Sequence, residues 1–256
     1  MPRFKGGPAR SLPEGGVTFA GPVVLILRVG SPVHAPFDFV AGHVVAALDG
    51  RRVLVDTGSP VTFGRGEHLR LVDGAHPIAT GVLGFTVETA AEHIRKLPGV
   101  APDFGVDVLL GTDLLWGHQL HLDFPSRMLR IAPATARDGT SRCSSRTRFL
   151  VEDLVVWGGR RALALVDTGA PVSYLSTQYT EGIPVAGWAR DFFHGGGDFQ
   201  VPLRIVPGSF RGCAVEVAFA EPPVSVWMAM RLLGVQAIVG TDLLEQLGSV
   251  DLDLTG

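Results

Sequence analysis

Residues 50–63 read GRRVLVDTGSPVTF, and residues 159–174 read GRRALALVDTGAPVSY. Each stretch carries Asp-Thr-Gly, beginning at Asp56 and at Asp167, with aliphatic residues before it and Pro-Val shortly after it. A lone Asp-Thr-Gly is typical of a turn in which the Asp side chain caps its own loop. Two copies in matching frames instead indicate an internal duplication.

The repeat continues past each triplet. Residues 108–115 read VLLGTDLL and residues 237–244 read AIVGTDLL. After each we expect a short helix and then an alternating strand, over residues 121–124 and 250–254. The distance from the Asp to the later Gly is 55 positions in the first copy and 73 in the second, so the second copy carries about 18 extra residues in its middle.

Each Asp follows a predicted β-hairpin. Strands over 44–48 and 51–55 flank an Asp-Gly turn, and strands over 154–157 and 160–166 flank a Gly-Gly turn. Each Asp is therefore expected where a buried strand ends in a sharp turn, with Gly allowing the two loops to approach closely. Longer helices are expected only over 87–97 and 227–233.

The composition agrees with an all-β fold. The chain has 256 residues with 46% hydrophobic, 18% charged, 33 Gly and 18 Pro, a profile typical of short strands joined by turns. The net charge of −3 does not suggest a nucleic-acid partner. We see no signal-peptide pattern and no run that could span a membrane, so we expect no membrane partner and a cytoplasmic location. The near absence of lysine suggests a bacterial origin in a GC-rich genome.

The repeat suggests a division of the chain. The stretch between the copies lacks periodicity and is rich in small and basic residues, which is typical of an exposed linker. The Pro- and Gly-rich start is expected to be flexible, and residues 1–16 could alternatively be a short inhibitory pro-segment. The expected parts are a flexible N-terminal segment (1–20), an N-terminal lobe (21–132), a linker (133–148) and a C-terminal lobe (149–256).

Other chemistries find little support in the sequence. Two cysteines, Cys143 and Cys213, favour free thiols over a disulfide. The eight histidines show no spacing typical of metal ligands, and we expect His118 and His121 on either side of a helix–strand junction. No Gly-Lys-Ser/Thr follows the glycine run at 195–197, and no Gly-x-Ser-x-Gly is present. We therefore expect no metal and no cofactor.

One Asp from each copy would suit the activation of water. Two carboxyls about 3 Å apart cannot readily both ionise, so one keeps its proton and the pair titrates as a unit. The ionised carboxyl can take a proton from water while the other stabilises an amide oxygen. Thr57 and Thr168 are suited to hydrogen-bonding between the loops. Ser59 is suited to donating to Asp56, whereas Ala170 has no hydroxyl, so we expect the two halves to be electrostatically unequal.

On these residues the chain resembles the aspartic peptidase superfamily, both pepsin-like and retropepsin-like. Those families share Asp-Thr-Gly followed by Ser, Ala or Thr, and a later hydrophobic-hydrophobic-Gly that passes behind the catalytic loop. The resemblance covers about 40–132 and 150–254, and residues 110–123 are similar to the protease domain of the DNA-damage-inducible family. It implies two homologous acid-protease-like β-barrel lobes, related by a pseudo-twofold axis, with the active-site cleft between them.

The resemblance also implies roles for individual residues. Asp56 and Asp167 would be catalytic, and no cofactor or metal would be needed. Because both lobes lie in one chain, a monomer could complete the site. The residues expected to support the active site are Thr57, Gly58, Ser59, Thr168, Gly169 and Ala170.

A flap is expected in the second copy. Retropepsin flaps are Gly-rich hairpins about 25 residues after the Asp, and residues 191–201 have this position; an ordinary glycine hairpin is the alternative. In the first copy the nearest candidate is 79–85, and neither Tyr174 nor Tyr179 occupies the place of the pepsin flap tyrosine. The residues expected to meet substrate are Phe193, His194, Gly195, Gly196, Gly197, Asp198 and Phe199.

One familiar element is missing. Retropepsins often pair an Asp after the motif with an Arg near the later Gly, but Pro60 and Pro171 occupy the first place and Thr112 and Thr241 the second. The ion pair of retropepsin dimers is therefore not expected, which leaves contacts with the substrate backbone at the outer subsites open.

The sequence thus predicts an aspartic endopeptidase that acts on peptide or protein substrates as a monomer. One alternative is a catalytically silent relative that binds peptides or proteins in the same cleft. Intact Asp-Thr-Gly in both copies argues against it. Another is a protein with one active lobe that works as a dimer, which a mass measurement in solution would distinguish.

Overall fold

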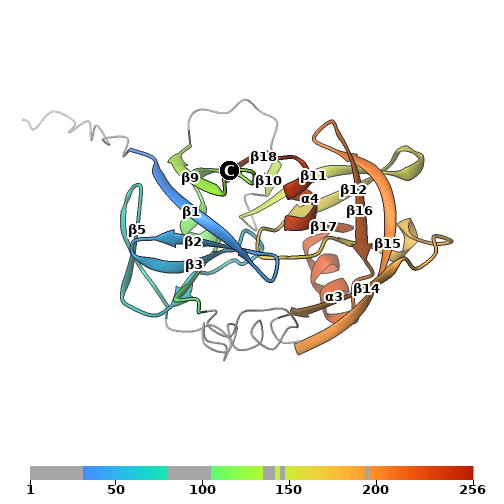
Figure 1. The fold of residues 1–256 in the computed structure, drawn as a ribbon, viewed down its shortest axis with the longest axis horizontal. Coiled ribbons are helices and arrows are strands. Elements are labelled where there is room, and N and C mark those ends of the chain that lie inside the picture. Colours follow the sequence, from blue (N-terminus) through green and yellow to red (C-terminus); the bar gives the residue numbers. More distant parts are fainter. Residues whose placement is uncertain (1–30, 80–104, 135–141, 145–147, 194–196, 256) are drawn as a thin grey trace, which may run out of the picture.

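The structure is a computed structural model that describes residues 31–79, 105–134, 142–144, 148–193 and 197–255. It is mostly β, with two eight-stranded sheets and one two-stranded sheet (Figure 1). The all-β class expected from the sequence is confirmed. Among the helices that the structure describes, none combines the length and the apolar character needed to cross a membrane.

The first sheet holds the first Asp-Thr-Gly and has the order β18-β8-β9-β1-β2-β3-β7-β4. A short helix, α2 (Thr112–Leu115), follows β7, and a separate hairpin of β5 (His68–Leu71) and β6 (Gly74–Pro77) was not predicted. The strands of the sheet are β1 (Val33–Val40), β2 (His43–Leu48), β3 (Arg51–Val55), β4 (Phe63–Gly64), β7 (Val108–Leu110), β8 (His118–Asp123), β9 (Met128–Pro133) and β18 (Ser249–Asp253).

The second sheet holds the second Asp-Thr-Gly and has the order β10-β11-β12-β17-β13-β16-β15-β14. Its strands are β10 (Arg142–Ser144), β11 (Phe149–Val156), β12 (Arg160–Val166), β13 (Tyr174–Leu175), β14 (Gly187–Phe193), β15 (Gly197–Phe210), β16 (Cys213–Ala220) and β17 (Ala237–Val239). Its helices are η1 (Trp157–Gly159), η2 (Thr177–Tyr179), α3 (Val224–Leu233) and α4 (Thr241–Gln246).

Five strands are arranged alike in the two sheets. In the first, β1, β2 and β3 form antiparallel pairs, β7 lies parallel to β3, and the short β4 lies antiparallel to β7. In the second, β10, β11, β12, β17 and β13 repeat this order and these directions. Each Asp-Thr-Gly therefore leaves a strand that pairs with the strand leading into Gly-Thr-Asp-Leu-Leu.

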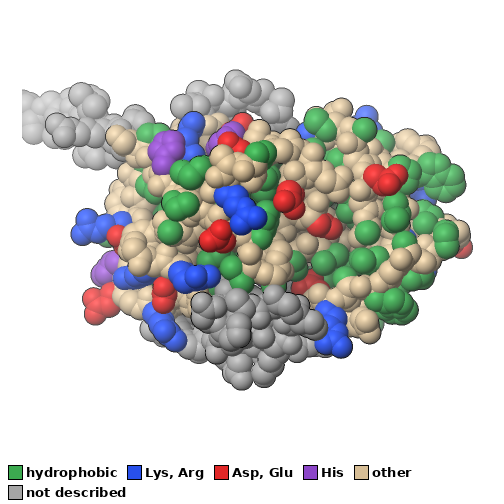
Figure 2. All heavy atoms as spheres, in the orientation of Figure 1, with side chains coloured by type: hydrophobic (Ala, Val, Ile, Leu, Met, Phe, Trp, Pro, Cys, Tyr) green, Lys and Arg blue, Asp and Glu red, His purple; other side chains and the backbone are tan. Residues whose placement is uncertain are grey.

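One apolar core extends through both sheets. The strands that precede the two triplets contribute Val55 and Val166, and their parallel neighbours contribute Leu110 and Val239, all fully buried. Burial of these side chains stabilises the fold by about 1.5–3 kcal/mol each. Leu54 and Leu165, whose side chains alternate with these, belong to two further clusters, so the ends of β3 and β12 are packed on both faces. Figure 2 shows hydrophobic side chains gathered mainly over the second sheet on the face in view.

The expected helices agree with the structure where it describes them. The helix predicted over 227–233 is α3, which begins three residues earlier and ends at Gly234 with φ of 71°, a conformation that glycine adopts readily. The two short helices after Gly-Thr-Asp are α2 and α4. The helix expected over 87–97 lies outside the described residues.

Four expectations about chain organisation were wrong in detail. The interlobe linker contains a strand, since β10 pairs with β11. The last strand, β18, pairs with β8 of the first sheet instead of staying with the second, because its alternating Val250 and Leu252 complete the buried face there. The turn before β12 includes Trp157 as well as the two glycines. His118 and His121 both lie on β8.

Candidate active site

The two Asp residues occupy equivalent positions at the ends of β3 and β12. The backbone N–H of Asp56 donates to the carbonyl of Leu110 at 3.0 Å, and that of Asp167 donates to the carbonyl of Val239 at 2.9 Å. Each carboxylate then accepts from its own loop, because the N–H two residues later lies 3.0 Å from Asp56 Oδ1 and 2.8 Å from Asp167 Oδ1. The parallel strand and the turn together fix where each carboxyl points.

The two loops meet at their glycines. A Cβ atom added to Gly58 would lie 2.2 Å from Oδ2 of Asp167, and one added to Gly169 would lie 2.3 Å from Cγ of Asp56. Real Cβ atoms do not approach other atoms so closely, so only glycine fits at either place. Each carboxyl therefore rests against the backbone of the opposite loop, and the two carboxyls are hydrogen-bonded to each other.

Two threonines join the loops through four reciprocal hydrogen bonds. The hydroxyl of Thr57 donates to the carbonyl of Val166 and the hydroxyl of Thr168 donates to the carbonyl of Val55, both at 2.8 Å. Each hydroxyl also accepts the backbone N–H of the other threonine, at 3.0 and 3.1 Å. Both side chains are fully buried. The cross-loop role predicted for these threonines is confirmed.

Burial and mutual charge set the protonation of the pair. Burial raises the pKa of Asp56 well above its ordinary value, the negative charge of Asp167 raises this pKa further, and the N–H of Gly58 opposes the change. Burial also raises the pKa of Asp167, but the N–H of Gly169 and the hydrogen bond with Asp56 act against it. The two groups titrate as a pair, and burial raises the pKa of both, so the pair keeps a proton to higher pH than a lone carboxyl would.

In each half of the chain, a further hydroxyl hydrogen-bonds the Gly-Thr-Asp segment that lies behind the Asp loop. Thr62 accepts the N–H of Gly111 at 2.9 Å and donates to Asp113 at 2.7 Å. In the other sheet Ser173 accepts the N–H of Gly240 at 2.9 Å and donates to Asp242 at 2.5 Å. These residues were not predicted as part of the site. Their signal in the sequence is a hydroxyl six positions after each Asp, together with the Asp that the two Gly-Thr-Asp segments share.

The hydroxyl of Ser59 does not donate to Asp56 as expected. It donates to the carbonyl of Val61 at 2.9 Å, and a hydroxyl has only one hydrogen to donate. The backbone N–H of Ser59 supplies a hydrogen bond that lowers the pKa of Asp56 instead. Behind the loops, the backbone N–H groups of Thr112 and Thr241 donate to the carbonyls of Ser59 and Ala170, at 2.8 and 2.9 Å.

The hairpin expected as a flap is present as β14 and β15. The two strands pair from Gly187 opposite Leu203 to Phe193 opposite Gly197. The residues at its tip, His194 to Gly196, and the side chains of 192–198 lie outside the described part. Phe199 packs beside the apolar cluster that includes Tyr174. At the base of the hairpin the hydroxyl of Tyr174 donates to the buried carboxylate of Asp191.

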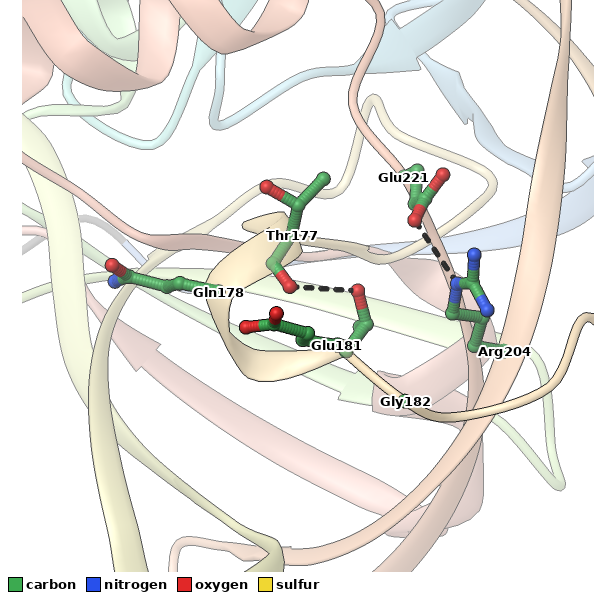
Figure 3. A pocket seen from close by; sticks show the side chains of 7 residues that line it. Thr177, Gln178, Glu181, Gly182, Arg204 and Glu221 are labelled. Carbon is green, nitrogen blue, oxygen red and sulfur yellow. Dashed lines mark hydrogen bonds and ion pairs between the residues drawn. The ribbon is translucent and has the colours of Figure 1, made fainter.

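A polar hollow lies on the second half of the chain, next to η2 (Figure 3). It has a volume of about 410 Å³ and is lined by Thr177, Glu181, Arg204 and Glu221, among others. Arg204 is already committed there, since its Nε donates to Glu221 at 3.0 Å and a terminal nitrogen donates to the carbonyl of Ile183. The hollow contains neither Asp of the pair, and the candidate site remains the meeting point of the two loops.

Three residues that the sequence analysis considered, one cysteine and two histidines, lie outside the two Asp-Thr-Gly loops. Cys213 is exposed and free. His118 is buried on β8, and Nδ1 of His121 donates to the carboxylate of Asp251, on β18, at 2.9 Å. Among the described residues, no group of three or more His, Cys, Asp or Glu side chains could hold a metal ion. His43, which the sequence did not suggest, contacts the loop of Asp167.

No family profile matches this chain, and no curated protein matches its sequence. The observations that bear on function are therefore the residues and geometry of the two Asp-Thr-Gly loops. Two partly exposed carboxyls in hydrogen-bonded contact, of which one is held protonated, can act together as a base and an acid on a single water molecule.

Proposed function

We propose that the protein is an aspartic endopeptidase, in which Asp56 and Asp167 share a proton and activate water to attack a peptide bond. The contact of the two carboxyls at the crossing of two reciprocally bonded loops carries this proposal. The resemblance of both copies to the aspartic peptidase superfamily supports the same assignment.

We further propose that the two halves are lobes related by an approximate twofold axis, with the substrate cleft between them. The shared order of five strands supports this arrangement. So do the reciprocal hydrogen bonds of Thr57 and Thr168 and the equivalent bracing by Thr62 and Ser173. Because one chain supplies both Asp residues, the proposed enzyme needs no second copy.

In the proposed reaction the ionised carboxylate of Asp167 takes a proton from water as the oxygen attacks the carbonyl carbon of the substrate. The carboxyl of Asp56 gives its hydrogen bond, and then its proton, to the carbonyl oxygen. A tetrahedral diol results. As the diol collapses, the C–N bond breaks, the proton held by Asp167 passes to the departing nitrogen, and one hydroxyl of the diol returns its proton to Asp56. The products are a carboxylic acid and an amine, and the pair again holds one proton.

We propose that the β14–β15 hairpin serves as a lid over the substrate, as its position in the sequence relative to Asp167 suggests. Its glycine tip and aromatic strands suit closure that excludes water, so we assign Phe193 to Phe199 to contact with the substrate. The substrate class that fits is an extended peptide, because a backbone amide of the substrate must reach the two Asp residues through the proposed cleft between the two sheets.

The test is cleavage of a mixed peptide library, followed by mass spectrometry from pH 3 to 7. The wild type is compared with Asp56→Asn, Asp167→Asn and the control Asp153→Asn, which changes an exposed carboxyl in a weak pair with Arg161 at 3.4 Å. We expect the wild type and the control to cleave at the same bonds. Both dyad variants should lose at least about a thousandfold in rate, since one carboxyl alone cannot serve as both acid and base.

The other outcomes are equally informative. Equal cleavage by all four proteins would point to a contaminant or to a different site. Absence of cleavage by the wild type at every pH, combined with saturable binding of peptides, would favour the catalytically silent relative over the endopeptidase.

A further inference from the structure

The first half of the chain contacts the loop that carries Asp167, and the described residues show no equivalent contact at the loop that carries Asp56. The turn between β1 and β2 reaches across to the Asp167 loop. The hydroxyl of Thr241, beside this loop, donates to the carbonyl of Gly42 at 2.5 Å. A Cβ on Gly42 would lie 2.6 Å from Cβ of Pro171, which shows how closely the turn and the loop are packed.

His43 makes the third of these contacts. It is 2% exposed, and its Nδ1 lies 2.7 Å from the carbonyl oxygen of Gly169. A carbonyl oxygen can only accept, so Nδ1 carries the hydrogen and donates it. The contact joins β2 of the first sheet to the Asp-Thr-Gly of the second.

The first Asp loop lacks an equivalent of His43. Val45 pairs with Leu54, two residues before Asp56, and Val151 pairs with Leu165, two residues before Asp167. His43 lies two residues before Val45, and Phe149 lies two residues before Val151. Phe149 therefore occupies the position equivalent to that of His43. Phenylalanine cannot donate a hydrogen bond, and within the described residues no side chain donates to the carbonyl of Gly58.

The hydrogen bond from His43 and one of the hydrogen bonds to Asp167 are made by the same peptide group. The carbonyl of Gly169 belongs to the same peptide group as the N–H of Ala170, and that N–H stabilises the ionised form of Asp167. Hydrogen bonds in a chain polarise one another, so a donor at the carbonyl strengthens the N–H at the other end. The corresponding peptide group at Gly58 and Ser59 has no such donor among the described residues.

We propose that His43 is a positioning residue of the dyad: its hydrogen bond to Gly169 holds the Asp167 loop in place and makes Asp167, in preference to Asp56, the carboxyl that ionises. This inference rests on the proposed function and extends it by assigning the base to Asp167 and the acid to Asp56. Among the described residues, burial and the charge of Asp191 raise the pKa of Tyr174, which also lies near enough to Asp167 for the charge of Asp167 to raise this pKa further, so Tyr174 stays neutral.

Three variants of His43 test the proposal. His43→Phe installs the residue of the other copy and removes the donor. His43→Asn keeps an amide N–H near the place of Nδ1, and His43→Gln moves the amide beyond it. We expect His43→Phe to lower kcat about tenfold with KM within about twofold, and to move the acidic limb of the kcat/KM profile to higher pH. Asn should restore both quantities, and Gln should not.

A second readout needs no activity. In the unliganded protein, the ¹³C signals of the Asp56 and Asp167 carboxyls report which group loses its proton first. We expect Asp167 to do so in the wild type and in His43→Asn, with the order less distinct or reversed in His43→Phe and His43→Gln. The buried His118→Asn serves as a control for the loss of a buried imidazole and should leave the order unchanged.

The results separate this inference from the proposed function. If the wild type cleaves no peptide, the endopeptidase proposal fails, and the carboxyl titrations still decide the role of His43. If the Phe and Gln variants titrate like the wild type, the inference is overturned, whatever their activity. A variant that only lowers the melting temperature, with the titration order intact, also overturns it. Should His43→Phe not fold, the contrast between Asn and Gln gives the same decision.

Discussion

Replacing Thr57 by valine should destabilise the protein far more than a surface change of the same size. Valine matches threonine in volume but removes the hydroxyl, so the N–H of Thr168 loses its acceptor and the carbonyl of Val166 loses its donor. Both groups lie in a buried part of the loop crossing. A buried backbone group left without its partner costs about 1–3 kcal/mol, so we expect the free energy of unfolding to fall by about 2–6 kcal/mol.

The matched control is Thr57→Ser, which keeps the hydroxyl and removes one methyl group, at a cost of about 1 kcal/mol. Urea denaturation, followed by tryptophan fluorescence, gives both values under one set of conditions. The valine variant should also lose peptide cleavage, whereas the serine variant should keep it. A valine variant as stable as the serine variant would refute the assignment of these hydrogen bonds as the link between the loops.

Three further predictions follow from the same geometry. Because burial raises the pKa of Asp56 and Asp167, the folded state favours their neutral forms. Ionising them in the folded protein therefore costs stability, and this cost grows as the pH rises above their pKa in the unfolded chain, about 4. Asp56→Asn should accordingly raise the melting temperature at pH 7 and not at pH 3. Gly169→Ala should lower kcat at least about a hundredfold, since displacing a reacting group by about 1 Å has that effect, and an unchanged rate would contradict the close approach to Asp56. In the folded protein the exposed thiol of Cys213 should react with Ellman's reagent, and Cys213→Ser should lower the number of reactive thiols per chain by one.

Much of the site could be predicted from sequence because its causes are local. The hairpin before each Asp depends on alternation and on a turn, which neighbouring residues determine. The roles of Thr57 and Thr168 follow from duplication, since two equal loops that meet must offer each other the same groups. The hydroxyls of Thr62 and Ser173 were open to the same reasoning, because they occupy the same offset in both copies.

Other features depend on residues that are distant in sequence. The sequence pattern predicts β18 as a strand, but its partner β8 lies in the other half of the chain. An alternating pattern predicts which face of a strand is buried and does not specify which strand it will pair with.

By itself, the amino-acid sequence determined the all-β class, the duplication and the two Asp-Thr-Gly turns, because period, turn chemistry and repetition are written in adjacent residues. Only the tertiary structure decided that the two carboxyls touch, that burial raises the pKa of both, and that His43 reaches Gly169, 126 positions away. Such contacts arise when two halves pack against each other, and burial and proximity, which set a pKa, exist only after that packing.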